Sequence, residues 1–234
     1  MHKLRVADVN LQIDYKYETM VKQAEAYKYD FDKPNITISI PQSDYELLRN
    51  ENPHLTNDEI EYIFTGSFFY EAFLHFNGFM LHSSGVCADG YAYLFSADPG
   101  TGKSTHTNLW LKYIKGAEII NDDKPAIRLI DDKIYVYGTP WSGKTDQNKN
   151  IRLPLGGIVF IERSEDNWIK EISVKEALPL ILGQTIRPTD PKLMNKLLDI
   201  LDVILSHTKV YKFGCNISKE AVETSYNAIK MEDK

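Results

Sequence analysis

The segment that most limits how this chain can fold lies at residues 91–114, where the apolar run YAYLF precedes SADPGTGKST and then HTNLWLKYI. Residues 97–104 match the phosphate-binding pattern G-x-x-x-x-G-K-[ST], except that Ala97 replaces the first glycine. A strand before such a loop and a helix after it bring backbone N–H groups and the helix N-terminus around an anion. Both flanks are present here, so the sequence predicts a strand, a phosphate-binding loop and a helix. We call residues 97–102 the glycine-rich loop.

Each position of this motif has an expected role if the loop binds a nucleotide. Lys103 then reaches the β- and γ-phosphate oxygens, and the Ser104 hydroxyl ligates Mg²⁺. A glycine-rich turn with a solvated lysine is the alternative, and the flanking strand and helix favour phosphate binding. We therefore expect ATP and Mg²⁺ to bind. The predicted nucleotide-binding residues are Asp98, Gly100, Thr101, Gly102, Lys103, Ser104 and Thr105.

A pair of aspartates, Asp122 and Asp123, follows the apolar stretch Ile119-Ile120 about one helix and one strand after the glycine-rich loop. We expect this stretch to form a strand next to the one that enters the loop, at the sheet edge where α/β proteins bind ligands. Two adjacent carboxylates can divide the work, one holding a metal ion and one accepting a proton from a hydroxyl. An aspartate-rich turn is the alternative, and the nearby phosphate-binding motif favours a catalytic pair.

Three histidines have different expected environments. His82 lies on the strand before the glycine-rich loop's strand, so it is either a hydrogen-bonded interior residue or a group near the γ-phosphate or the metal. We place it with the two aspartates as a candidate catalytic residue. His106 is expected to face solvent or to lie beside the helix cap, and His75 is expected to be a core residue.

Basic residues in loops are candidates for contact with the phosphate or the acceptor. Lys144 and Arg187 each follow a turn-forming segment between strong elements, where binding residues are often displayed, so we predict that they bind substrate. The other candidates are Lys149, Arg152 and Arg163. Trp141 either stacks on a base or packs as a lid, and the sequence leaves this open.

Apolar strands and amphipathic helices alternate over most of the chain. Capping boxes at Thr56 and Ser173 each have a glutamate three residues later, and Asp190-Pro191 begins a longer helix. Hairpins are expected at residues 88–90 and at Asp131-Asp132. The pattern predicts an α/β fold with a mixed sheet flanked by helices. The helix after Thr56 is expected to bury Ile60, Ile63, Phe64, Phe68, Ala72 and His75.

The first third of the chain is polar and rich in tyrosine, with one clear strand expected at residues 35–40, before Pro41. We therefore predict an N-terminal extension, residues 1–55, packed on a nucleotide-binding domain of residues 56–234. The net charge of −6 argues against a nucleic-acid partner. The two cysteines are too few for a disulfide scaffold, and no stretch is apolar enough to span a membrane, so we expect a cytoplasmic protein with no membrane partner.

Taken together, LHSSG, ADPGTGKST, INDD and LPLGGIVFIE resemble the kinase domain of HPr serine kinase/phosphorylase and, more distantly, phosphoenolpyruvate carboxykinase. The resemblance covers residue 79 to the C-terminus. It implies a P-loop fold of the HPr kinase/phosphoenolpyruvate carboxykinase type, with His82 as the family's histidine and Asp98 as its acidic loop residue. It also implies that Lys103 and Ser104 contact the nucleotide and Mg²⁺, and that Asp122 or Asp123 supplies the metal ligand and the acid/base group. We assign Asp123 to the metal together with Ser104.

The chain differs from HPr kinases in two regions. After the double aspartate they carry a glutamate and an Arg-Gly pair, whereas this chain reads NIRLPLGGIVF, with Arg152 but no glutamate. Their usual N-terminal domain is also not recognisable here. The chain more closely resembles shorter HPr-kinase-like proteins of bacterial peptide-modification and secondary-metabolism clusters, which implies serine in a peptide, or a small hydroxyl compound, as acceptor.

The sequence thus predicts a kinase that transfers the γ-phosphoryl group of ATP to a hydroxyl, with serine as the expected acceptor. One alternative is chemistry of the phosphoenolpyruvate carboxykinase type, for which the chain shows no second lobe to enclose a small carboxylic acid. The second alternative is a nucleotide-responsive binding module without phosphoryl transfer. Two carboxylates beside Mg²⁺ argue against this alternative. Formation of a homo-oligomer is left open.

Overall fold

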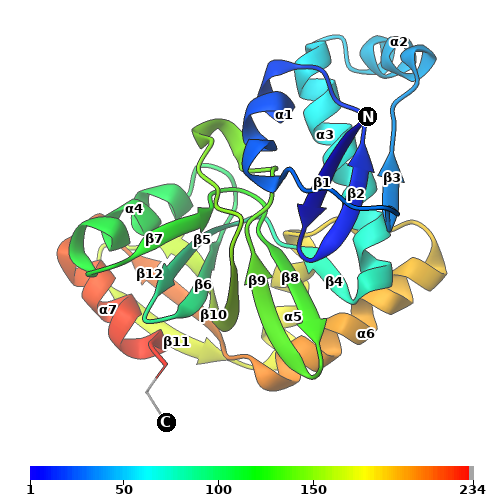
Figure 1. Cartoon of the computed structure of the whole chain (residues 1–234). Coiled ribbons are helices and arrows are strands. Elements are labelled where there is room, and N and C mark those ends of the chain that lie inside the picture. The colour runs from blue at the N-terminus through cyan, green and yellow to red at the C-terminus, as the bar shows by residue number, and fades with distance from the viewer. Residues whose placement is uncertain (232–234) are drawn as a thin grey trace.

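The computed structural model describes residues 1–231 and is organised around the long strand β10 (Arg152–Arg163). The first residues of β10 pair antiparallel with β9 (Lys133–Tyr137), and its later residues pair parallel with β6 (Tyr91–Ser96) and β12 (Val210–Cys215). The sheet therefore curls at β10 from an antiparallel half into a half that contains parallel strands (Figure 1). This confirms the predicted mixed α/β class.

The remaining strands of the nine-stranded sheet extend it on both sides of β10. The strand order is β4-β8-β9-β10-β6-β5-β7, and β12 pairs with β10 and β11. Their bounds are β4 (Gly78–Met80), β5 (Ser83–Ala88), β7 (Glu118–Asn121), β8 (Ala126–Ile130) and β11 (Trp168–Ile172). The expected hairpins are both present, with positive φ at both residues of the turns Asp89-Gly90 and Asp131-Asp132.

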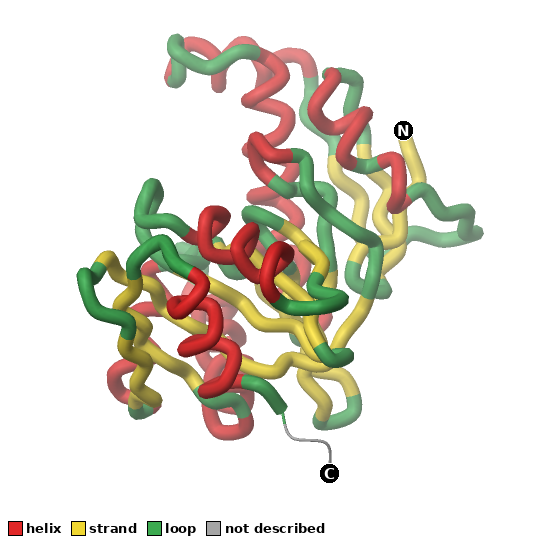
Figure 2. Tube along the Cα trace, turned by 90° about the vertical axis from the view of Figure 1, so that its left-hand side faces the viewer, coloured by secondary structure: helices red, strands yellow, loops and turns green. Residues whose placement is uncertain are grey.

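Different helices cover the two faces of this sheet (Figure 2). Successive side chains of a strand point to opposite faces, so neighbouring residues contact different helices. On β6, Leu94 packs in one apolar cluster with α5 (Val174–Gly183) and α6 (Pro191–His207). The neighbouring Phe95 packs in another cluster with α4 (Lys103–Tyr113) and α7 (Lys219–Ile229). Both predicted capping boxes are formed, and Asp190 caps α6. The parallel strands are thus buried on both faces.

Residues 1–73, which we call the N-terminal unit, comprise the predicted extension, residues 1–55, together with the helix at Asn57–Phe73, and hold a second sheet with strand order β1-β2-β3. Three helices accompany it, and α3 contacts β3, α1 and α2. Only the third strand was expected from the sequence. The bounds are β1 (His2–Val6), β2 (Val9–Ile13), β3 (Ile36–Ile38), α1 (Glu18–Gln23), α2 (Gln42–Glu51) and α3 (Asn57–Phe73). Short 3₁₀ helices lie at Glu25–Tyr27, Leu74–Phe76 and Gly143–Thr145.

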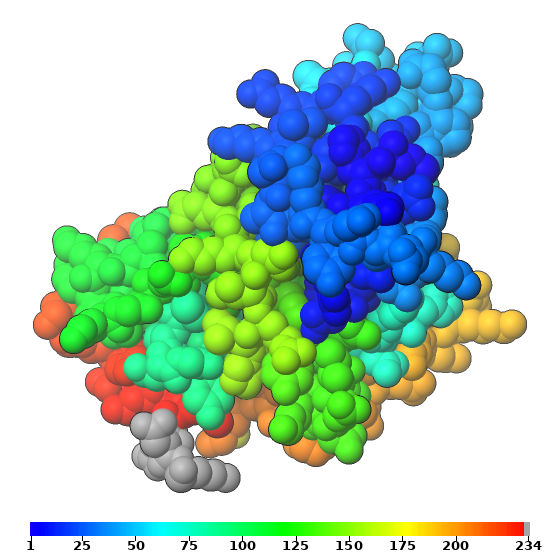
Figure 3. All heavy atoms as spheres, in the orientation of Figure 1, coloured from blue at the N-terminus to red at the C-terminus, as the bar shows by residue number. Residues whose placement is uncertain are grey.

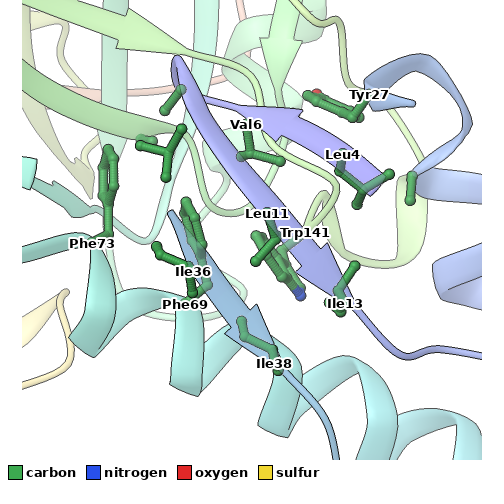
Figure 4. Packing of buried hydrophobic residues seen from close by; sticks show 14 of the residues in the cluster. Leu4, Val6, Leu11, Ile13, Tyr27, Ile36, Ile38, Phe69, Phe73 and Trp141 are labelled. Atoms are coloured by element: carbon green, nitrogen blue, oxygen red, sulfur yellow. The ribbon is translucent and has the colours of Figure 1, made fainter. Parts of the chain in front are cut away.

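The N-terminal unit shares its apolar core with the larger sheet (Figure 4). Leu4 and Leu11 pack in one cluster with Ala126 and Trp141. The Trp141 side chain is fully buried and stacks on Phe69, with ring centroids 4.9 Å apart, so it is a core residue in this structure. No helix among residues 1–231 combines the length and the apolar character needed to cross a membrane.

The buried face of α3 differs from the prediction. Ile60 is buried as expected, but Ile63 and Phe68 are exposed and His75, beyond the helix, is exposed too. The residues that face the core are Glu61, Thr65, Gly66, Phe69, Tyr70 and Phe73. The reason is that α3 packs against the small β1-β2-β3 sheet, which the sequence pattern did not reveal.

Candidate functional site

The candidate residues meet at one edge of the larger sheet because of how the strands pair. The glycine-rich loop leaves the end of β6, and the start of β5 lies beside it, since Ser83 pairs with Ser96. The end of β7 lies on the other side of β5, where Asn121 pairs with Gly85. The strand before the aspartates is therefore not next to β6, as predicted, but one strand further away. The intervening antiparallel β5 brings His82 between the loop and the aspartates.

The glycine-rich loop combines two backbone positions that suit glycine with the start of a helix. Gly100 and Gly102 have φ of +77° and +126°, which side-chain-bearing residues rarely adopt, whereas Ala97 has no positive φ and does not need to be glycine. The helix α4 begins directly after the loop and has no side-chain cap, so its first N–H groups are directed at the loop. Lys103 is buried and its Nζ donates to the Ala97 carbonyl across the loop at 2.9 Å.

A cavity of about 620 Å³ adjoins this loop. Arg163, at the end of β10, lies at its rim and donates hydrogen bonds to the Gly100 carbonyl at 2.5 Å and to the Thr101 carbonyl at 3.3 Å. The cavity has both polar and apolar walls. They include Gly102, Thr105, Leu109, Ile161, Asn216 and Ile217. This cavity could not be predicted from local sequence patterns, because its walls come from α4, β10 and the segment after β12.

Asp122 and Asp123 occupy different environments. Asp122 is buried, and its Oδ1 accepts a hydrogen bond from Ser84 Oγ at 2.5 Å. Ser84 Oγ is also 2.8 Å from Oγ1 of Thr107, which lies one turn after Lys103 on α4. Two hydroxyl groups therefore connect the Asp122 carboxylate to the start of the helix that follows the glycine-rich loop. Ser84 and Thr107 were not singled out in the sequence.

Asp123 is more accessible and is held by three side chains. Its Oδ1 is 3.3 Å from Nε2 of His82, and its Oδ2 accepts from Lys124 Nζ at 2.6 Å and from the Tyr62 hydroxyl at 3.3 Å. His82 is in turn oriented by Gln184, whose Oε1 is 2.9 Å from Nδ1 of the imidazole. The carboxylate and imidazole thus form a pair with fixed orientation at the edge of the site.

The electrostatics of the site follow from its burial. Desolvation, reinforced by the nearby Lys103 ammonium, lowers the pKa of His82 despite the opposing effect of Asp123. The imidazole is therefore neutral near pH 7 and able to accept a proton. Desolvation also lowers the pKa of Lys103, while Asp123, Asp122 and Asp98 raise it. The loop lysine, the histidine and the aspartates thus lie close enough together for their charges to interact.

Other predicted residues lie at varying distances from this centre. The Asp98 carboxylate accepts from Gln184 Nε2 at 3.1 Å and so joins the His82 side of the site. Lys144 and Arg187 are exposed, and neither bonds to the site residues within the described part of the chain. Lys144 directly follows Gly143, which packs against Asp123.

His106 does not face solvent, contrary to the prediction. It is 3% exposed, and its Nε2 is 3.0 Å from Ser225 Oγ on α7 and accepts from Trp110 Nε1 at 3.1 Å. The side chains of Phe95 and Phe213 approach its ring edge to face. The helix α4 therefore turns this residue inward, onto the sheet and α7.

Within residues 1–231, no three His, Cys, Asp or Glu side chains come close enough to hold a metal ion by themselves. A cation at this site would take further oxygen ligands, such as those of a bound phosphate, in addition to those of the protein. Mg²⁺ often binds in this way, through one or two carboxylates together with phosphate oxygens. The carboxylate and hydroxyl groups near the loop are hard oxygen donors that fit this ion.

No protein-family model matches the chain, and no curated protein matches it in sequence. Among solved structures, the chain is similar to the Hpr(Ser) kinase/phosphatase from Coxiella burnetii, with a TM-score of 0.38 and 10% sequence identity. That similarity covers 64% of this chain and 95% of the other.

Proposed function

We propose that this chain is an ATP-dependent P-loop kinase, of the HPr kinase/phosphoenolpyruvate carboxykinase type, that transfers the γ-phosphoryl group to a hydroxyl. The observation that carries the proposal is that Lys103, His82 and the two aspartates meet at one sheet edge, beside a helix N-terminus that has no side-chain cap. Phosphoryl transfer needs phosphate-binding donors, a cation and a carboxylate near the attacking oxygen. Here they come from the loop and helix after β6, from the residue before β5 and from the residues after β7.

The nucleotide would bind across the glycine-rich loop. Its phosphates would accept hydrogen bonds from the loop and the α4 N–H groups, with Lys103 turned from the Ala97 carbonyl to the phosphate oxygens. Its nucleoside would occupy the cavity of about 620 Å³, which lies on the loop's side and has a size typical of small-molecule sites. Arg163, already bonded to the loop, lies at the entrance to that cavity.

Ser104 and one aspartate would hold Mg²⁺, which neutralises charge on the phosphates when bound. The sequence prediction gave this role to Asp123. The contacts favour Asp122, because it connects through Ser84 and Thr107 to the start of α4 and forms no ion pair within residues 1–231. Asp123 is paired with His82, whose neutral imidazole can accept a proton, so we give Asp123 the proton-handling role.

The transfer step uses the remaining residues. The acceptor oxygen forms a bond to the γ-phosphorus as the bond to the β–γ bridging oxygen breaks, and ADP leaves. The hydroxyl proton passes to the Asp123–His82 pair, where the neutral imidazole is a further proton acceptor. Lys103 stabilises the charge on the transferred group. The acceptor we propose is serine in a peptide or a small hydroxyl compound, with Lys144 and Arg187 as candidates for binding it.

Transfer of label from γ-labelled ATP tests this function. The protein is incubated with Mg²⁺ and a panel of serine-containing peptides, free serine and other small hydroxyl compounds, with parallel reactions in EDTA. We expect Mg²⁺-dependent label on at least one acceptor, together with stoichiometric ADP. Tight ATP binding by calorimetry without transfer to any acceptor would contradict the kinase proposal and favour a nucleotide-responsive binding module.

A further inference from the structure

The turn at residues 142–143, between β9 and β10, is held by side chains from the N-terminal unit. Gln23, the last residue of α1, is buried; its Oε1 accepts from the Ser142 N–H at 3.2 Å and its Nε2 donates to the Gly143 carbonyl at 2.8 Å. Tyr62 on α3 accepts from the Gly143 N–H at 2.8 Å. Two side chains of this unit thus satisfy three backbone groups of one turn.

The same turn lies directly against Asp123. Gly143 has φ of +71°, and a Cβ at this position would lie 3.0 Å from the Asp123 Cβ. The Tyr62 hydroxyl that holds the turn also donates to Asp123 Oδ2, and the Lys124 ammonium lies over the Tyr62 ring, 5.1 Å from its centroid. Burial raises the pKa of Tyr62, so the hydroxyl keeps its proton and remains a donor.

Further contacts join the N-terminal unit to the rest of the same loop, residues 138–150. Lys22 forms an ion pair with Asp146, and Asn150 Nδ2 donates to the Ala26 carbonyl at 3.0 Å. Figure 3 shows the blue atoms of the N-terminal unit lying against the yellow-green atoms of this loop. The loop in turn binds the end of β7, since the Asp122 N–H donates to the Gln147 carbonyl at 3.1 Å. Both aspartates are therefore connected to the N-terminal unit.

We propose that Tyr62 is a positioning residue for Asp123, and that Gln23 and Tyr62 make the N-terminal unit a working part of the transfer site. This rests on the proposed function, because it assigns Asp123 to the transfer step. A carboxylate that receives a proton from a hydroxyl must keep its distance and direction, and small displacements of reacting groups slow a reaction strongly. Tyr62 fixes Asp123 Oδ2 and the adjoining turn with a single hydroxyl group.

Amide hydrogen exchange, read residue by residue, tests the contact independently of any activity. We expect Tyr62→Phe to speed exchange at the Gly143 N–H, and Gln23→Ala at the Ser142 N–H, each by about fivefold or more. Tyr45→Phe is the matched control, because its hydroxyl donates to Glu61 at 3.0 Å in the same unit without touching the turn. Unchanged exchange at Gly143 in Tyr62→Phe would overturn the proposal.

Steady-state kinetics then test positioning. We expect Tyr62→Phe to lower kcat by about tenfold to 100-fold while leaving ATP affinity unchanged, because the hydroxyl acts on Asp123 and not on the glycine-rich loop. Tyr45→Phe should keep the wild-type kcat. A wild-type kcat in Tyr62→Phe would overturn the positioning role. A wild-type protein that transfers no label would instead contradict the proposed function, and the exchange data would still decide whether the contact exists.

Discussion

Lys103 is a buried cation whose side chain bonds to a neutral group. Its ammonium donates to the Ala97 carbonyl, and the three nearby carboxylates act on it without forming an ion pair. Desolvation is the largest effect on its pKa, so the charged form is stabilised less here than in water. An anion placed in the glycine-rich loop would compensate for this lost solvation, since buried charges need partners. The burial of this lysine therefore supports the proposal that it contacts phosphate.

The first prediction concerns this side chain. Lys103→Ala should weaken ATP binding at least about tenfold and abolish transfer, because a hydrogen bond to a charged group contributes about 1.5–3 kcal/mol. Lys112→Ala is the control, since Lys112 lies on the same helix and is exposed. Calorimetry with Mg²⁺–ATP measures both affinities. Equal affinity of wild type and Lys103→Ala would show that this loop does not bind the phosphates.

The second prediction concerns the aspartate pair. Asp122→Asn and Asp123→Asn each keep size and polarity but remove the charge, so turnover should fall by orders of magnitude while the midpoint of unfolding changes little. The chain offers a matched control in Asp131→Asn and Asp132→Asn, a second aspartate pair in the exposed β8–β9 turn. If both Asp122→Asn and Asp123→Asn turned over like wild type, neither aspartate would be a base or an essential metal ligand.

At the scale of elements, α4 is fixed by its inward face as well as by the loop before it. His106 lies between α4, α7 and the larger sheet, and its burial lowers its pKa to about 4. In the unfolded chain a histidine titrates near its ordinary value of about 6.5. The unfolded state therefore binds more protons between these two values, and stability must rise with pH across this window.

This gives the third prediction. As the pH falls from 7 to 4, His106 should cost the protein up to about 3 kcal/mol of unfolding free energy, since each pKa unit corresponds to about 1.36 kcal/mol. Urea unfolding at several pH values compares wild type with His106→Gln, which should lose the corresponding part of the pH dependence. His75→Gln is the control, because His75 is exposed. The same pH slope in wild type and His106→Gln would contradict the assignment.

Local signals predicted most elements of the larger sheet and its helices. Capping boxes, turn dipeptides and apolar runs depend on residues close in sequence, and the structure contains the elements they predicted. The prediction of the buried face of α3 was wrong because aromatic residues occur on both sides of this helix. The sequence pattern cannot tell which side a distant sheet will cover. Gly66 could have indicated the buried side of α3, since a Cβ at this position would lie 3.1 Å from the Trp141 ring.

The candidate site also contains residues that the sequence predicts and residues that it does not. The glycine-rich loop and the aspartate pair are contiguous motifs, so the sequence reveals them, and the structure brings them to one sheet edge with His82. Their partners Gln23, Tyr62 and Arg163 come from other elements and meet the site only through tertiary packing. The strands β1 and β2 were missed even though buried Leu4, Val6, Val9, Leu11 and Ile13 alternate with polar residues along them.

At the scale of the whole molecule, the N-terminal unit and the larger sheet are joined by a common core and by the loop at residues 138–150. Asp123 lies where these parts meet, because Tyr62 comes from α3 and Gly143 from the loop. An acceptor that reaches Asp123 therefore approaches a surface to which both parts contribute. Lys144 is exposed on this loop directly after Gly143, so under the proposed function it is a candidate for contact with such an acceptor.

The last prediction is that the acceptor is a peptide or a small hydroxyl compound and not folded HPr. A kinase that docks a folded protein needs a dedicated surface of roughly 600 Å² or more per partner. The chain lacks the glutamate and Arg-Gly segment that HPr kinases carry before GGIVFIE. A small acceptor needs only a pocket with a cation for its carboxylate, and Lys144 or Arg187 could supply that cation. A competition assay tests this prediction. Wild type and Lys144→Ala are each given labelled ATP together with a mixture of HPr, serine-containing peptides and free serine. Label should appear on a peptide or on serine, less so with the variant; label chiefly on HPr would show that these differences do not control acceptor choice.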